Sequence, residues 1–245
     1  MVHAFFNPAQ ADKFNALAGR RDTTFIVTYF GIHGLGGVTR TLLAISGQKF
    51  TSINPEDWAT NEKLKAPFGS MPLLAETSAD GKTTIQIAES DAIERYLSKK
   101  IGLLGSNAFE ETLINTFVSN AQFLQHAILS KYMTVKDPEV KAVNKEPLIT
   151  ANIVPWIKNN EQHLAANGSN GHFVGNKVTL ADIKAVFLMD LIGCVTGDEL
   201  ISKSKTPAIW AVREELDKVE NLAAWKKTEM YKDLSEKNFA ALGFY

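Results

Sequence analysis

Thr179-Leu180-Ala181-Asp182 opens the apolar run 183–192, and this stretch carries the strongest structural signal in the chain. A Thr followed three residues later by Asp is a variant of the capping box. The hydroxyl accepts a hydrogen bond from an unpaired backbone N–H, and the carboxylate accepts one from the N–H of the capping residue. The stretch therefore predicts a buried helix that begins after a short turn at 171–178.

The N-terminal part of the chain begins with a predicted strand and helix. Residues 25–31 predict a short strand, because they are apolar, β-branched or aromatic and end at a glycine. Apolar residues at helical spacing predict a helix over 38–46. Gly47 stands just past that helix, at the position where a C-cap glycine is common.

A hairpin and a second helix follow. Pro72 stands at the entrance of an apolar strand, where its missing N–H is tolerated. Asp80-Gly81 is a turn signal, and 83–87 is the predicted return strand. Ser90 is the predicted cap of the next helix. This half of the chain is therefore of mixed α/β type.

Beyond residue 107 the pattern is helical. The two glycines within 99–107 indicate a linker. Helical patterns cover 108–133, 139–167 and 207–222. We predict three parts of the chain: an N-terminal extension at 1–24, which looks exposed at Arg20-Arg21-Asp22 and has no assigned role, an α/β domain at 25–100, and an all-helical domain at 108–245.

Composition limits the classes of function. The chain has 245 residues, 45% of them hydrophobic, and a formal net charge of −1, so we expect neither a nucleic-acid nor a membrane partner. Its apolar runs are too short for a bilayer span, and 1–24 lacks the pattern of a secretory signal, which favours a cytoplasmic protein. Cys194 is the single cysteine; an intrachain disulfide is impossible, and we expect no metal.

The order of these elements resembles the glutathione-binding half of a thioredoxin-like domain. Together with their order, Tyr29-Phe30, Arg40, Met71-Pro72, the helix start at Ser90 and Thr179-Leu180-Ala181-Asp182 resemble the sigma class of cytosolic glutathione transferases over roughly residues 25–230. The resemblance implies an α/β thioredoxin-like N-terminal domain and an all-α C-terminal domain. It also implies a homodimer with glutathione as co-substrate.

Activation of the glutathione thiol is the chemistry that this resemblance implies. A free thiol has a pKa near 8.5, so little thiolate exists at neutral pH. The resemblance makes Tyr29 the catalytic residue, because its hydroxyl could donate a hydrogen bond to the sulfur anion. It gives Arg40 the role of lowering the Tyr pKa or favouring the developing negative charge. Without the resemblance, such a Tyr is more often a core residue and such an Arg a surface or interface residue.

The resemblance also assigns residues to the two inner parts of glutathione. An extended cysteinyl unit can pair with the backbone at Met71, and the family implies a cis bond between Met71 and Pro72. At a helix N-terminus, Ser90 would bind the γ-glutamyl carboxylate. Glu89 would pair with the amine, although sigma-type sequences usually have Gln there.

For the glycyl carboxylate, the resemblance points to a loop that carries Trp58 and Lys63, with Lys65 as a competing choice. Family members also receive a carboxylate from the partner subunit. At that position this chain has the uncharged Asn115, which either substitutes as a hydrogen-bond partner or weakens binding. The assigned glutathione-binding set is Trp58, Lys63, Ser70, Met71, Pro72, Glu89 and Ser90.

A small hydrophobic electrophile should bind beside this site. The expected lining lies in the loop after the first strand and on the first long helix: Phe30, Ile32 and His33, with Val118, Gln122 and His126. By itself, His126 is more simply a helix-face histidine than a catalytic base. The sequence does not name the electrophile.

Three classes of function fit this reading. The first is a dimeric glutathione transferase, whose site could also isomerise prostaglandin endoperoxides or reduce lipid hydroperoxides. The second is a non-catalytic scaffold of the same fold, favoured by Asn115 and the irregular Trp58 loop but opposed by Tyr29 and Ser90. The third is a thiol oxidoreductase, which would need a cysteine near the end of the first strand. Residues 29–40 contain none.

Overall fold

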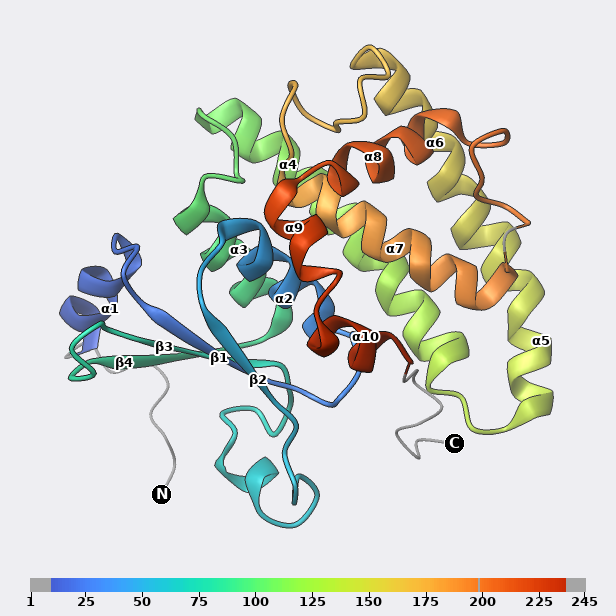
Figure 1. The fold of residues 1–245 in the computed structure, drawn as a ribbon. Helices are drawn as coiled ribbons and strands as arrows, with labels where there is room; N and C mark the ends of the chain where they lie inside the picture. The colour runs from blue at the N-terminus through green and yellow to red at the C-terminus, as the bar shows by residue number, and fades with distance from the viewer. Residues whose placement is uncertain (1–9, 198, 237–245) are drawn as a thin grey trace. The chain divides into compact units, whose positions relative to one another are not determined.

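The computed structural model describes residues 10–197 and 199–236 and divides into two compact units. The first unit holds the described residues up to Ile101 together with 220–236, and the second holds the described residues of 102–219 (Figure 1). Residues 220–236 thus group with the N-terminal part of the chain. The boundaries 1–24, 25–100 and 108–245 stay a prediction.

The first unit is built on a four-stranded mixed sheet in the order β2-β1-β3-β4. Its strands are β1 (Thr24–Thr28), β2 (Phe50–Ile53), β3 (Leu73–Thr77) and β4 (Thr84–Ala88). The β1 and β2 strands are parallel, whereas the other neighbours are antiparallel. The predicted strand over 25–31 is wrong at its end, because β1 stops at Thr28 and leaves Tyr29 just beyond the sheet.

Helices α2 and α3 pack against each other and against this sheet. Helix α2 (Gly36–Ser46) begins two residues before the predicted start, and Gly47 ends it with a left-handed φ of 68°, which confirms the predicted C-cap. Helix α3 (Ser90–Ile101) begins at the predicted serine. The other helices of this unit are α1 (Ala11–Ala18), the 3-10 turn Glu62–Lys65, α9 (Glu220–Trp225) and α10 (Glu229–Glu236).

The second unit contains the helices α4 to α8. They are α4 (Ala108–Ile128), α5 (Pro138–Leu148), α6 (Val154–Ala166), α7 (Leu180–Thr196) and α8 (Pro207–Asp217). Single π turns continue α4 and join α5 to α6, so the predicted helices over 108–133 and 139–167 are confirmed. The predicted helix over 207–222 is confirmed from Pro207 to Asp217 and wrong near its end, because the chain leaves α8 after Asp217 and a separate helix, α9, begins at Glu220.

The predicted cap of α7 is confirmed, and its carboxylate does more than cap the helix. Asp182 is 1% exposed. One of its oxygens accepts hydrogen bonds from Thr179 N (2.6 Å) and Thr179 Oγ1 (2.9 Å), and the other accepts one from Phe173 N (2.7 Å). The carboxylate therefore ties the preceding turn to the start of a helix that is buried along most of its length and packs against α4 and α8.

None of the helices within 10–197 and 199–236 is both long and apolar enough to cross a membrane. The α/β unit with a thioredoxin-like sheet and the helical second unit agree with the fold class expected from the sequence.

Candidate functional site

Tyr29 lies at the end of β1 and is enclosed by a glycine-rich loop. Its side chain is 4% exposed, and its hydroxyl oxygen accepts a hydrogen bond from the backbone N–H of Leu35 at 3.1 Å. A Cβ added at Gly34 would lie 2.8 Å from the Tyr29 hydroxyl, and one added at Gly36 would lie 2.9 Å from the ring. Glycines at these two positions therefore let the loop close around the phenol.

The surroundings of Tyr29 keep its hydroxyl protonated at neutral pH. Burial raises the pKa of the phenol, and this effect exceeds the opposing effects of the Leu35 N–H and the Arg40 charge. A protonated phenol can donate a hydrogen bond to an anion placed beside it. The site thus offers a donor, and the phenol does not act as a base.

Arg40 lies in α2 and organises the loop after Tyr29. Its guanidinium donates hydrogen bonds to the carbonyl oxygens of Ile32 (2.7 Å), His33 (3.3 Å) and Phe30 (3.2 Å) and to Oγ of Ser52 (2.9 Å). The residue is 0% exposed, and burial lowers its pKa to about 10, which still leaves it charged at neutral pH. Its guanidinium carbon lies 5.7 Å from the centre of the Tyr29 ring. Arg40 thus holds the loop through three carbonyl oxygens and is itself tied to residue 52 through the Ser52 hydroxyl.

The entrance to β3 and the start of α3 lie side by side. The Met71–Pro72 peptide bond is cis, as expected, and Pro72 is buried. Because β3 pairs with β4 in a register that places Leu73 opposite Ala88, the residues just before β3 lie next to those just after β4. Ser70 Oγ donates to Glu89 Oε1 at 3.3 Å across this junction.

Glu89 has a φ of 69°, which is unusual for a residue other than glycine. Such backbone conformations are costly and are often found at functional sites. Ser90 follows as the first residue of α3, where unpaired N–H groups and the helix dipole favour an anion. This junction therefore joins a carboxylate that could bind an amine to a helix terminus that could bind a carboxylate.

The loop with Trp58 and Lys63 comes close to the same strand entrance. Lys63 N donates to Trp58 O at 3.0 Å. The Lys63 side chain lies alongside Gly69, with its Cε 3.6 Å from the position of a Cβ added there. Lys63 is exposed, as is Lys65. The side chain of Lys63 therefore lies beside Gly69, one residue before Ser70.

The residues expected to line an electrophile pocket belong to two different units. In the first unit, Ile32 is 2% exposed and Phe30 packs edge-on against Tyr29 with ring centres 5.4 Å apart. In the second, Val118 is 0% exposed and so belongs to the core of the helical unit, whereas Gln122 is half-buried. The pocket stays a prediction. Asn115 Nδ2 donates to Glu111 O of its own helix.

His33 connects the loop after Tyr29 to α10. Its Nε2 lies 3.0 Å from Ser235 Oγ, and its ring lies 4.7 Å from the ring of Tyr231 and 6.0 Å from that of Trp225. Burial, followed by the charges of Arg40 and Lys226, lowers the pKa of His33 to about 4. The imidazole is therefore neutral at neutral pH.

This low pKa predicts that acid destabilises the first unit through His33. The unfolded chain binds a proton near pH 6.5 and the folded chain only near pH 4, so stability is complete above pH 6.5 and falls as the pH drops through this window. Between pH 7 and 4.5 the melting temperature of wild type should fall by on the order of 4 °C more than that of His33→Gln. Scanning calorimetry measures this, with the exposed His126→Gln as control; equal pH profiles for wild type and His33→Gln would contradict the prediction.

Sequence reasoning missed two partners of this site. The Leu35 N–H is a backbone donor, and its only sequence signal was the group of glycines around it. Ser52 lies on β2, a four-residue strand that was not predicted. Cys194 lies on α7, where partial burial and Asp190 raise the pKa of its thiol. A raised pKa disfavours the thiolate that an oxidoreductase would need.

Within the part of the chain that the structure describes, no three His, Cys, Asp or Glu side chains come together in a way that could hold a metal ion.

Residues 124–229 match the family described as glutathione S-transferase, C-terminal domain. Probable glutathione S-transferase 6 of Caenorhabditis elegans is 32% identical over 163 residues, which cover 64% of this chain and 74% of that protein. The structure of prostaglandin synthase D of Nilaparvata lugens is similar with a TM-score of 0.71 and 27% identity, covering 84% of this chain and 98% of the other. The fold is also that of a Fasciola hepatica sigma class GST, with a TM-score of 0.73 and 24% identity over 84% of this chain and 97% of the other.

Proposed function

This chain belongs to the glutathione S-transferase family, and we propose that it is a sigma-like enzyme that joins the sulfur of glutathione to small hydrophobic electrophiles. We further propose that it acts in the cytoplasm as a homodimer. The observation that carries the proposal is the hydroxyl of Tyr29. Tyr29 is buried one residue beyond β1, and its hydroxyl oxygen accepts a hydrogen bond from the Leu35 N–H.

In the proposed reaction, Tyr29 stabilises the thiolate form of glutathione. Its protonated hydroxyl donates a hydrogen bond to the sulfur anion, while the Leu35 N–H donates to the phenol oxygen. A second donor on that oxygen polarises the O–H bond and strengthens the hydrogen bond to the anion. The sulfur lone pair then forms the C–S bond, and the leaving group departs with its electron pair; in an addition reaction, the substrate takes up a proton instead.

Glutathione would lie along the junction between β3 and α3. The backbone at Met71 would pair with the extended cysteinyl unit as an added strand. Ser90 would bind the γ-glutamyl carboxylate, and Glu89 would bind the amine, with Ser70 holding the Glu89 carboxylate. Lys63, with Trp58 beside it, would bind the glycyl carboxylate. The γ-glutamyl carboxylate, the amine and the glycyl carboxylate are the three charged groups that would be bound in this way.

Arg40 would act as a positioning residue in this mechanism. Its hydrogen bonds to three loop carbonyls keep the turn after β1 closed, and that turn supplies the Leu35 N–H to Tyr29. The charge of Arg40 also opposes the rise in the Tyr29 pKa, but burial outweighs it. Its main contribution is therefore the geometry of the donor.

A second candidate reaction uses the same thiolate. One structural neighbour at 27% identity is named a prostaglandin synthase D, which favours testing isomerisation of a lipid endoperoxide alongside conjugation. Both reactions need a glutathione thiolate in the site. They differ in the product, which either carries glutathione or does not.

The first test is to titrate glutathione into the purified protein near neutral pH and to monitor the thiolate by its ultraviolet absorbance. We expect a thiolate signal that saturates with glutathione, because the Tyr29 hydroxyl favours the anion. S-methylglutathione, which has no ionisable thiol, is the control ligand. Failure to bind glutathione would support a non-catalytic scaffold, and binding without a thiolate signal would remove Tyr29 from the proposed chemistry.

A further inference from the structure

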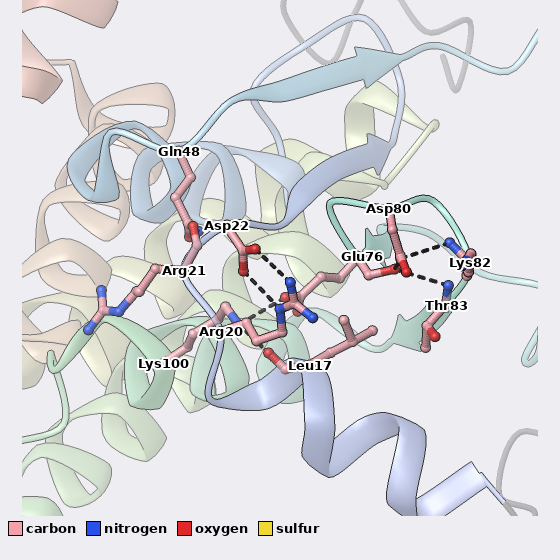
Figure 2. Close-up of polar contacts among 11 residues, drawn as sticks. Leu17, Arg20, Arg21, Asp22, Gln48, Glu76, Asp80, Lys82, Thr83 and Lys100 are labelled. Atoms are coloured by element: carbon pink, nitrogen blue, oxygen red, sulfur yellow. Dashed lines mark hydrogen bonds and ion pairs between the residues drawn. The ribbon is translucent and has the colours of Figure 1, made fainter.

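A buried ion pair joins the far ends of β3 and α3. Lys100 Nζ, in the last turn of α3, lies 2.8 Å from Oε1 of Glu76 on β3, and the two side chains are 1% and 0% exposed (Figure 2). An ammonium group held this far from water is costly unless oxygen atoms surround it. The stability of the buried ammonium therefore depends on the other oxygen atoms that Lys100 Nζ contacts.

Those partners come from the N-terminal helix. Lys100 Nζ donates to the carbonyl oxygens of Leu17 at 2.7 Å and Ala18 at 3.3 Å, which are the last two residues of α1. Carbonyl groups at the end of a helix lack partners inside the helix, and the helix dipole makes that end attractive to a cation. Lys100 thus adds a charged donor to the end of α1, where Leu17 O also accepts from Arg20 N at 2.9 Å, while α1 completes the surroundings of the buried ammonium.

Tyr96 and Phe14 extend this contact. The hydroxyl of Tyr96 donates to the second oxygen of Glu76, and burial, followed by this carboxylate, raises the pKa of Tyr96, so the phenol stays a donor. The ring of Phe14, on α1, packs edge-on against the ring of Tyr96 with centres 5.2 Å apart. Leu17, the one residue of α1 that is buried, completes the attachment.

The segment between α1 and β1 adds one weaker link. Gln48 Nε2 donates to Arg21 O at 2.8 Å, whereas the two-pronged ion pair of Arg20 with Asp22 lies within the segment itself (Figure 2). These contacts are exposed, and exposed ion pairs contribute little to stability. The attachment of the segment therefore depends mainly on Lys100 and on the apolar side chains of α1.

From these contacts we infer that residues 10–22 form an intramolecular latch, locked onto the first unit by the buried Lys100–Glu76 pair. The latch and the pair depend on each other. Without α1, the buried ammonium would lose two of the oxygens around it, and without Lys100, the end of α1 would lose its cationic cap. This gives a role to the N-terminal segment, and it holds whether or not the protein binds glutathione.

The decisive variant removes all the polar groups of the cluster together: Glu76→Leu, Tyr96→Phe and Lys100→Met in one full-length protein. Replacing a buried ion pair by apolar residues of similar size often leaves the global stability unchanged. We therefore expect a similar midpoint of thermal unfolding. Trypsin should cleave after Arg20 and Arg21 at least about tenfold faster, because α1 has lost a charged hydrogen-bond donor and opens more often.

Lys99→Met is the matched control, because Lys99 is the exposed neighbour of Lys100 on the same helix. It should leave the rate of cleavage after Arg20 and Arg21 as in wild type. Equal cleavage rates in wild type and the triple variant would overturn the latch, because the apolar contacts of α1 would then suffice.

A measurement on the wild-type protein keeps the test decisive if the triple variant does not fold. A locked α1 should open together with the ion pair, so its backbone amides should exchange with deuterium about as slowly as those in the last turn of α3. Exchange in α1 that is a hundredfold faster than at that turn would show an unlocked helix and overturn the inference.

Discussion

Tyr29→Phe should lower the rate of glutathione conjugation by roughly one to three orders of magnitude, because one donor to a developing anion is worth about 2–4 kcal/mol. Affinity for glutathione should change little, since in the proposed binding mode the charged groups of the molecule bind elsewhere. The thiolate absorbance of bound glutathione should disappear in the variant. Steady-state kinetics with a chromogenic electrophile and the glutathione titration measure both effects.

Two controls separate this chemical effect from a loss of structure. The variant removes the acceptor of the Leu35 N–H, which should cost about 1 kcal/mol of stability, so both proteins are compared well below their melting temperatures. Tyr132→Phe removes a phenol from the helical unit and should leave conjugation unchanged. A Tyr29→Phe protein that binds glutathione and turns over as fast as wild type would exclude Tyr29 from the mechanism.

Asp182→Ala should lower the free energy of unfolding by roughly 3 kcal/mol. Loss of a helix cap typically costs about 1 kcal/mol, and leaving a buried N–H without its acceptor costs about 1–3 kcal/mol more. Both losses apply here, because the buried carboxylate accepts from Thr179 N and Thr179 Oγ1 through one oxygen and from Phe173 N through the other. Urea unfolding measures the change through the transition midpoint.

Asp137→Ala is the matched control for this prediction. Asp137 caps α5 by accepting from Glu139 N at 2.8 Å and Val140 N at 3.4 Å, but it is exposed. Water can replace its carboxylate, so the loss should be about 1 kcal/mol. Asp182→Asn keeps one acceptor oxygen, so its loss of stability should fall between those of Asp182→Ala and Asp137→Ala. If Asp182→Ala cost no more than Asp137→Ala, the turn before α7 would not depend on the buried carboxylate.

Features encoded by neighbouring residues could be predicted from the sequence. The capping box at Thr179, the C-cap at Gly47 and the start of α3 at Ser90 each follow from side-chain chemistry within a few residues. The cis bond at Pro72 was expected from the resemblance and is present. The missed strand β2 has four residues at the edge of the sheet, with half-buried and exposed positions alternating, and so lacks a continuous apolar signal.

The residues of the candidate site stay a prediction, and their contacts came only from the structure. The resemblance placed Tyr29 and Arg40 in one site, and the structure shows that Arg40 donates hydrogen bonds to three loop carbonyls and to Ser52 on β2. Backbone donors such as the Leu35 N–H carry no sequence signature, because every residue except proline has one. Only the path of the chain shows which N–H reaches the phenol.

By itself the sequence determined the α/β and helical halves of this chain and several helix ends, because periodicity and caps act between residues close in the chain. The candidate site residues came from the family resemblance and stay a prediction. Only the tertiary structure decided which residues far apart in the sequence contact each other. Lys100 contacts Leu17, which lies 83 positions away in the sequence, and no local sequence pattern predicts this contact. The cost of burying a charge makes that contact specific, since a buried ammonium is stable only where the fold brings oxygens to it.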